Sequence, residues 1–235
     1  MTDFVLVHGA WHGSWCWARL RHLLALQGHR VFTPTLTGLG ERSHLLARDV
    51  GLETHIADVA NLLIWEDLRD IVLVGHSYAG FIARHVADRV PDRIRSLVYL
   101  DAFVPDDGAA LFDYLPDRGK GDRDLAEAQG DGWKVPPRLA ASFRVNAADA
   151  AWVDRQCTMH PLATFEAPAR ITGACDRIQN IGYILARGFD GPFEQFAAIA
   201  KRRGWWRQEF ACGHDVMLDA PNDLAALLQQ RALVL

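Results

Sequence analysis

The stretch IVLVGHSYAGFI, residues 71–82, is an apolar run that breaks at one serine, Ser77, and then resumes. The residues before the break are apolar without alternation, which is typical of a strand buried on both faces of a parallel sheet. Residues 81–90 continue as a helix that Pro91 ends. We therefore expect Ser77 at a strand-to-helix junction, above the carboxyl edge of the sheet, where open parallel sheets bind ligands.

The residues around Ser77 are small, as such a turn requires. A sharp strand-to-helix turn is strained and tolerates only small flanking side chains. Gly75 supplies one, Ala79 stands where glycine is usual, and Gly80 follows. The nearby helix N-terminus favours developing negative charge. Together these features favour a nucleophilic serine over a glycine–serine turn that only joins two buried elements.

A serine hydroxyl needs a base, and His214 is the best placed of the ten histidines. It lies in ACGHDVML, residues 211–218, after the last predicted strand and about twenty residues before the chain end. In enzymes with this strand–turn–helix order the base comes last along the chain. The surroundings of four other histidines read as polar surface patterns: His22, His29, His44 and His55.

A carboxylate should orient the imidazole of that base. Asp101 closes the predicted strand SLVYLD and would lie at the carboxyl edge of the sheet, close to Ser77. Asp190 follows the predicted strand IGYILA, and a loop in that place is the commoner home of the acid. Asp101 is preferred, Asp190 is the alternative and Asp176 a more remote one. Asp215 is expected to point elsewhere and to cap a helix.

Acyl transfer also needs hydrogen-bond donors for the oxyanion of the tetrahedral intermediate. The backbone N–H of Tyr78, directly after the serine, is one candidate. The backbone N–H of Ala10 is the other, because it lies in the glycine-containing loop HGAWHG that follows the first predicted strand. The same loop is also an ordinary strand-to-helix connection.

Strand and helix patterns alternate along most of the chain. Apolar runs predict strands at residues 4–7, 30–33, 70–75, 96–101, 181–186 and 205–210. This alternation indicates an α/β fold with a mainly parallel sheet of about six strands and helices on both faces. The pattern weakens between residues 105 and 168. We expect a core formed by residues 1–104 and 169–235, with residues 105–168 inserted as a lid over the sheet.

Composition and charge exclude several classes of function. The net charge is −4 and no basic block occurs, which disfavours nucleic acid as a partner. No leader pattern and no run of roughly 18 apolar residues is present, so we expect a cytoplasmic protein that does not engage a membrane. His8 and His12 are four apart but lie in a glycine-containing loop, and the cysteines form no C-x-x-C pair. We therefore expect no metal site.

Five segments together resemble the α/β-hydrolases: FVLVHGAWHGSWCW, TPTLTGLGERSHLL, VLVGHSYAGFI, VYLDAFVPDDG and CGHDVMLDAP. The most similar branch is that of esterases and hydroxynitrile lyases, which includes plant methylesterases, bacterial esterases and carbamate hydrolases. The resemblance covers nearly the whole chain and is weakest in residues 105–168. It implies the α/β-hydrolase fold, a serine nucleophile, a late histidine, a carboxylate and no cofactor, and Ser77 and His214 match the first two positions.

Three comparisons within this branch bear on the site. In the plant methylesterases the acid follows the strand equivalent to IGYILA, and Asp190 falls about one position off that register. The resembling lyases carry threonine where Gly9 stands, and lysine where Asp215 stands. Because neither of these lyase residues is present, the resemblance favours an esterase.

The sequence thus predicts a serine-dependent hydrolase of small-molecule carboxylic esters, with carbamates as a related class. Three tryptophans are candidates for an apolar pocket that takes aromatic or alicyclic esters: Trp11, Trp133 and Trp152. A hydroxynitrile-lyase-like enzyme is the first alternative, which a mandelonitrile cleavage assay would detect. A receptor that keeps the triad and binds a ligand without fast turnover is the second. A homodimer is also considered.

Overall fold

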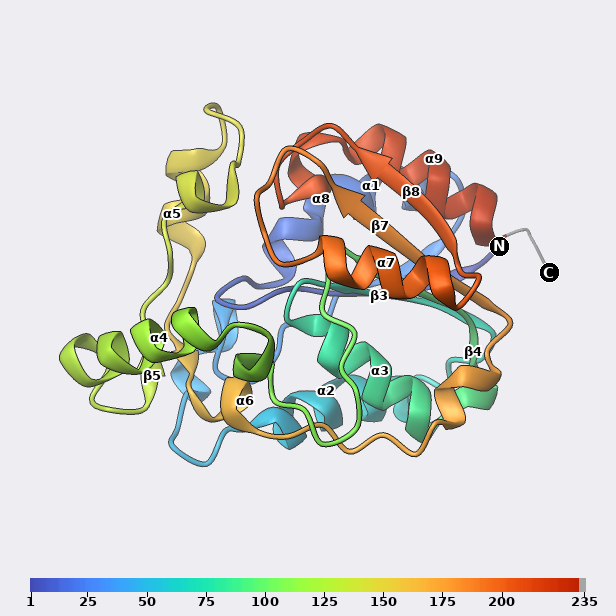
Figure 1. The fold of residues 1–235 in the computed structure, drawn as a ribbon. Coiled ribbons are helices and arrows are strands. Elements are labelled where there is room, and N and C mark those ends of the chain that lie inside the picture. Colours follow the sequence, from blue (N-terminus) through green and yellow to red (C-terminus); the bar gives the residue numbers. More distant parts are fainter. Residues whose placement is uncertain (233–235) are drawn as a thin grey trace.

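The computed structural model describes residues 1–232, and a parallel six-stranded sheet forms its centre (Figure 1). The strands are β1 (Asp3–Val7), β2 (Arg30–Phe32), β3 (Ile71–His76), β4 (Ile94–Leu100), β7 (Asn180–Ala186) and β8 (Trp206–Phe210). Their order in the sheet is β2-β1-β3-β4-β7-β8, and every neighbouring pair is parallel. The predicted α/β fold is confirmed.

The burial of each strand explains its sequence. The central strands β3 and β4 are almost fully buried, as their continuous apolar runs predict. The edge strand β8 is mostly exposed, the edge strand β2 is partly exposed, and both carry charged residues. The chain runs outward from β1 to β2 and then returns to β3, so the strand order reverses between β1 and β3. Ligands bind in open α/β sheets at the carboxyl ends of strands at such a reversal.

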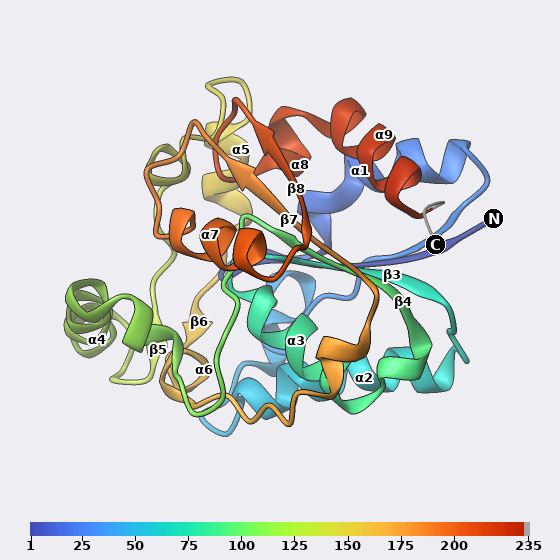
Figure 2. The same cartoon turned by 45° about the vertical axis from the view of Figure 1, so that its right-hand side comes forward.

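Helices cover both faces of this sheet (Figures 1 and 2). They are α1 (Ala18–Leu26), α2 (Leu52–Trp65), α3 (Ala79–Arg89), α7 (Glu194–Arg202), α8 (Val216–Asp219) and α9 (Pro221–Ala232). Helices α2 and α3 lie side by side on one face, and α1 and α9 lie on the other. In the part of the chain that the structure describes, no helix is both long and apolar enough to cross a membrane.

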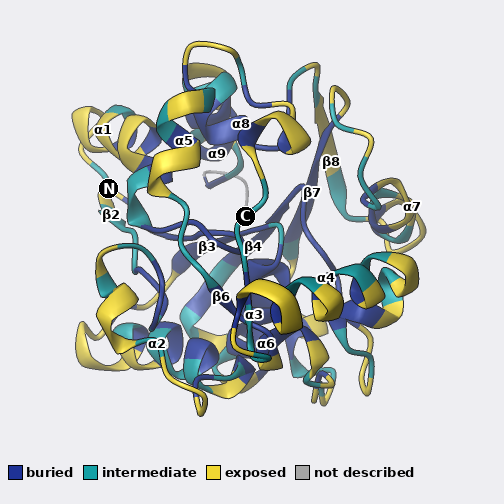
Figure 3. Cartoon of the chain, turned by 90° about the vertical axis from the view of Figure 1, so that its left-hand side faces the viewer, coloured by how far each residue is buried: buried dark blue, intermediate teal, exposed yellow. Residues whose placement is uncertain are grey.

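Much of the segment between β4 and β7 lies at the end of the sheet toward which the strands point (Figure 1). Its elements are α4 (Pro116–Gln129), β5 (Lys134–Val135), α5 (Ala150–Gln156), β6 (His160–Pro161) and α6 (Ala163–Glu166). Strands β5 and β6 pair antiparallel in a small separate sheet. Figure 3 looks onto this end and shows α4 and α5 with exposed outer surfaces in front of the buried sheet.

Candidate active site

Ser77 occupies a strained turn between β3 and α3. Its φ is +56°, in the left-handed region that only a few non-glycine residues adopt. Its N–H donates to Leu100 O at 3.2 Å, and its carbonyl accepts from the N–H groups of Gly80 and Phe103 at 3.1 and 3.2 Å. These bonds to α3, to β4 and to the loop after β4 hold a conformation that would otherwise be unfavourable, as is common at functional sites.

Two glycines make this turn possible. A Cβ on Gly75 would lie 2.6 Å from Ala79 O, and a Cβ on Gly80 would lie 1.9 Å from Phe103 O. Real Cβ atoms do not come so close to a backbone oxygen. Residues 75 and 80 therefore cannot carry a side chain, whereas alanine is accommodated at residue 79, where the sequence motif usually has glycine.

His214 and Asp101 meet beside this turn. The Nδ1 atom of His214 lies 2.6 Å from Oδ2 of Asp101, and both side chains are buried. The other carboxylate oxygen of Asp101 accepts the N–H of Ala186 at 3.0 Å, so both oxygens are engaged. A carboxylate accepts, so Nδ1 of His214 carries the proton and Nε2 is left free to take one. Asp101 also has a left-handed φ, of +41°.

The two alternative carboxylates lie elsewhere. Asp190 is exposed, in the loop between β7 and α7. Asp176 forms ion pairs with Arg203 at 3.0 Å and Arg84 at 3.4 Å. Of the acids considered from the sequence, the structure therefore brings Asp101 to His214.

The two candidate oxyanion donors line the same cavity as Ser77 and His214. Ala10 and Tyr78 are both buried, and within residues 1–232 neither backbone N–H has a hydrogen-bond acceptor. A buried N–H without a partner is rare unless it serves a ligand or water. Both groups are thus available to a negative oxygen formed next to Ser77.

The Tyr78 side chain is anchored by His55, which the sequence reading placed on the surface. His55 is fully buried, and burial lowers its pKa to about 4. Its Nε2 lies 2.9 Å from Thr37 O, so this nitrogen donates, and its Nδ1 accepts from the Tyr78 hydroxyl at 2.9 Å. The surface prediction for His55 is wrong because these two partners satisfy both ring nitrogens in the interior.

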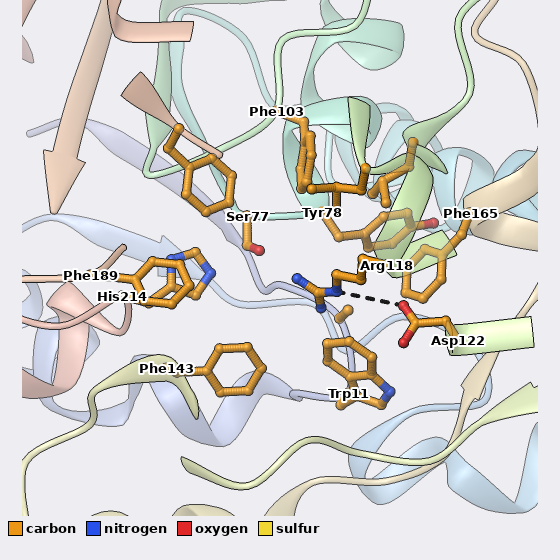
Figure 4. Close-up of a pocket in the computed structure, with 14 residues that line it drawn as sticks. Trp11, Ser77, Tyr78, Phe103, Arg118, Asp122, Phe143, Phe165, Phe189 and His214 are labelled. Carbon is orange, nitrogen blue, oxygen red and sulfur yellow. Dashed lines mark ion pairs between the residues drawn. The ribbon is translucent and has the colours of Figure 1, made fainter. Parts of the chain in front are cut away.

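The cavity at Ser77 is lined mainly by aromatic side chains (Figure 4). Ser77, from the turn between β3 and α3, and His214, from the loop between β8 and α8, both line it. Its apolar lining includes Trp11, Phe103, Phe143, Phe165, Phe189 and Phe193. Phe189 and Phe193 also pack on the His214 ring, with centroids 4.7 and 5.0 Å away. This lining is typical of a site for a small apolar ligand.

Trp11 connects the loop of residues 8–13, which carries Ala10, to the segment 105–168. Its indole N–H donates to Val135 O at 3.1 Å, and its carbonyl accepts the N–H of Thr158 at 2.9 Å. Its own N–H donates to Nδ1 of His160 at 3.3 Å. Trp11 lines the cavity, as expected from the sequence.

The expectation that two other tryptophans line this cavity is wrong. Trp133 lines a separate hollow together with Arg48, and the Nζ atom of Lys134 lies 5.0 Å from the centre of its ring. Trp152 packs edge-on against Trp15, with ring centroids 5.0 Å apart. Both belong to the segment 105–168, but phenylalanines occupy the positions that face Ser77.

His12 and Asp215 form a buried ion pair that was not predicted from the sequence. His12 places Nδ1 at 2.8 Å from Ala10 O and Nε2 at 3.0 Å from Oδ2 of Asp215. Both partners are acceptors, so both ring nitrogens carry protons and His12 is cationic. Burial alone would lower the pKa of His12, but the Asp215 carboxylate outweighs it and raises that pKa above its ordinary value.

This pair ties the loop that carries Ala10 to the loop that carries His214. Burial alone would raise the pKa of Asp215, but His12 holds it well below its usual range. Asp215 stands at the N-cap position of α8, yet its side chain makes no capping bond. The helix-cap expectation for Asp215 is therefore wrong, because its carboxylate faces His12.

We expect Asp215→Asn to be less stable than the wild type by an amount that grows as the pH falls from 8 to 5. The folded-state pKa of His12 is raised, so its stabilisation is fully present below the unfolded value of about 6.5 and is lost as the pH rises through the folded value. Without the carboxylate, burial should lower the pKa of His12, as it lowers that of buried His8 to about 3.

The difference in free energy of unfolding between wild type and Asp215→Asn should therefore grow by about 1.4 kcal/mol for each pH unit below 6.5. Urea unfolding of both proteins at several pH values measures it. Asp223→Asn, on the exposed side of α9, is the matched control. A deficit for Asp215→Asn that does not vary with pH would contradict the ion pair.

Comparison with known proteins gives this site a context. The family model described as "Alpha/beta hydrolase family" matches residues 4–227. The chain is 45% identical over 238 residues to a carbendazim hydrolyzing esterase of Nocardioides sp. (strain SG-4G), covering 97% of this chain and 98% of that protein. It is 37% identical over 105 residues to Methylesterase 2 of Arabidopsis thaliana, which covers 44% of this chain and 40% of that protein.

A solved structure of an extracellular alpha/beta-hydrolase from a Paenibacillus species is also similar. It superposes with a TM-score of 0.86 at 25% sequence identity, covering 100% of both chains. That protein is described as sharing structural and functional homology with tobacco Salicylic Acid Binding Protein 2.

Proposed function

The chain belongs to the alpha/beta hydrolase family and is a carboxylic-ester hydrolase of its esterase branch, and we propose that it acts through an acyl-enzyme on Ser77. Ser77 is the nucleophile, His214 the general base and Asp101 the carboxylate that orients the imidazole. The backbone N–H groups of Ala10 and Tyr78 stabilise the oxyanion. The family membership bears out the resemblance seen in the sequence.

The proposed reaction has two halves. Nε2 of His214 takes the proton from Ser77 Oγ as that oxygen attacks the ester carbonyl, and the carbonyl oxygen becomes an oxyanion held by the two N–H groups. The tetrahedral intermediate collapses, and the alkoxide leaves with the proton from His214. Water then attacks the acyl-enzyme, gives its proton to His214 and releases the carboxylic acid, and Ser77 regains its proton.

One observation carries this proposal: the 2.6 Å contact between Nδ1 of His214 and the buried carboxylate of Asp101. It fixes the ring tautomer, so the free nitrogen is the one that can accept a proton. It also offsets the charge that the ring gains when it takes the proton from Ser77.

The aromatic cavity supports aromatic esters as the preferred substrates, with carbamates as a related class. The similar Nocardioides protein is an esterase that hydrolyses carbendazim, and the similar Arabidopsis protein is a methylesterase. Residues 105–168 act as a lid in this proposal, since Leu111, Leu115 and Phe143 of that segment line the cavity. The cytoplasmic location and the homodimer stay predictions from the sequence.

We expect kcat/KM for methyl benzoate to exceed that for methyl hexanoate by tenfold or more. A planar ring can stack on phenylalanines such as Phe143 and Phe189, and each aromatic pair contributes about 0.5–1.5 kcal/mol beyond burial of area. Steady-state kinetics on the two esters tests this, with mandelonitrile as a third compound to detect lyase activity. A preference for the aliphatic ester would count against the aromatic pocket, and cyanide release without ester hydrolysis would count against the esterase.

A further inference from the structure

The cavity holds one cation that the proposed chemistry does not use. Arg118 lies in the first turn of α4, and its guanidinium group points into the cavity between Ser77 and Trp11 (Figure 4). The guanidinium carbon lies 5.6 Å from the centre of the Trp11 ring. The other polar side chains that line the cavity are Asp122, His214 and the hydroxyl groups of Ser77 and Tyr78.

Arg118 is only partly neutralised by its neighbour. Its Nε lies 3.5 Å from Oδ2 of Asp122, too far for a good hydrogen bond. The Asp122 carboxylate is engaged more closely by Arg138, whose Nη2 lies 2.5 Å from Oδ1. Two guanidinium groups thus share one carboxylate, so Asp122 does not fully neutralise Arg118.

The hydrogen-bond donors of Arg118 are free. Within residues 1–232 its guanidinium makes no hydrogen bond, and its Nε is buried without a partner. Burial lowers its pKa to about 10, so the group is still a cation at neutral pH. Leaving the buried Nε donor of this guanidinium without an acceptor is costly, and its Nη donors are also without an acceptor among the described residues. A ligand that supplies an acceptor would remove this cost.

We propose that Arg118 selects aromatic esters whose ring carries a hydrogen-bond acceptor, such as a carbonyl or carboxylate oxygen. This inference rests on the proposed esterase function and adds the substrate class. The phenylalanines take the face of the ring, and Arg118 donates to the acceptor on its edge. A hydrocarbon substituent of the same size would leave the guanidinium unpaired and would bind less well.

Three ring-substituted methyl benzoates test this proposal, each as its meta and para isomer. The substituents are acetyl (a neutral acceptor), carboxylate (an anionic acceptor) and isopropyl (a hydrocarbon of similar size). For each isomer, kcat/KM of the acceptor ester is divided by kcat/KM of the isopropyl ester. This ratio is then compared between wild type and Arg118→Met, so that the electronic effect of the substituent on the scissile ester cancels.

We expect at least one acceptor ester to lose tenfold or more in this ratio when Arg118 becomes methionine. The acceptor with the larger loss identifies whether the recognised group is neutral or anionic. Lys120→Met is the matched control, because it removes an exposed cation of the same helix that pairs with Asp124 outside the cavity. The control should leave the ratio unchanged.

Arg118→Gln serves as a second variant and decides the question if the methionine variant does not fold. It removes the charge and keeps a polar side chain, and we expect the ratio to fall severalfold. Ratios that stay within twofold of the wild type for both acceptors would overturn the role of Arg118, even if every ester is hydrolysed. Failure of the wild type to hydrolyse any of the esters would instead overturn the proposed esterase function.

Discussion

Ser77→Ala is expected to lower kcat for p-nitrophenyl ester hydrolysis by roughly 10⁴- to 10⁶-fold, to a residual rate set by the oxyanion donors. The loss is large because no acyl-enzyme can form without the serine oxygen. The fold should persist, since the hydroxyl is not needed for the backbone bonds to Leu100, Gly80 and Phe103 that hold the turn. Steady-state kinetics on the purified variant measures the effect.

The matched control is Ser96→Ala on the neighbouring strand β4. The hydroxyl of Ser96 is buried and, within the described residues, has no hydrogen-bond partner, so its removal should leave kcat unchanged. Thermal unfolding of both variants shows whether they remain folded. Full turnover by a folded Ser77→Ala protein would end the nucleophile assignment.

Asp101→Asn is expected to lower kcat by about 10⁴-fold with little change in KM. An asparagine in this place has to accept the Ala186 N–H with its oxygen, which turns its NH₂ group toward Nδ1 of His214. The imidazole would then hold its proton on Nε2, and in this tautomer it cannot take the proton of Ser77. Steady-state kinetics with separate values of kcat and KM measures the effect.

Asp190→Asn is the control for this prediction and also tests the alternative left open by the sequence. Asp190 is exposed in the loop after β7, so its replacement should change kcat less than twofold. A large loss in Asp190→Asn, together with a small loss in Asp101→Asn, would mean that the acid is Asp190 and that the loop moves to reach His214.

The sheet could be predicted from the sequence because its signals are local. Continuous apolar runs mark β3 and β4, and the small residues at Gly75 and Gly80 mark the turn that carries Ser77. His214 could be singled out because, in this fold, a serine at a strand-to-helix turn is followed late in the chain by the histidine that acts as its base. These inferences need no knowledge of contacts between distant segments.

The acid could not be settled from the sequence because it depends on the packing of neighbouring strands. Asp101 and Asp190 each follow a strand of the same sheet. Strands β4 and β7 are paired with Leu100 opposite Ile184, and Asp101 directly follows the last residue of β4. Asp190 is four residues beyond the end of β7, at Ala186, and that distance takes it to the surface.

Long-range contacts also explain the other errors. The segment 105–168 folds over the sheet without a strong periodic pattern, so which of its aromatic residues face Ser77 was not visible, and phenylalanines line the cavity in place of Trp133 and Trp152. The pairing of His12 with Asp215 joins residues 203 positions apart. The local signal for this pair was weak: His12 lies in the loop that carries Ala10, and Asp215 directly follows His214.

The central claim is that Ser77 is the nucleophile, and covalent labelling tests it most directly. The wild type is incubated with an alkyl fluorophosphonate, which transfers a phosphonyl group to an activated serine with loss of fluoride. Intact-protein and peptide mass spectrometry then locate the adduct while esterase activity is followed in parallel. We predict one adduct per chain, on the peptide that contains Ser77, formed in proportion to the loss of activity and absent from Ser77→Ala. An adduct on another residue, or full esterase activity after complete labelling of Ser77, would contradict the account.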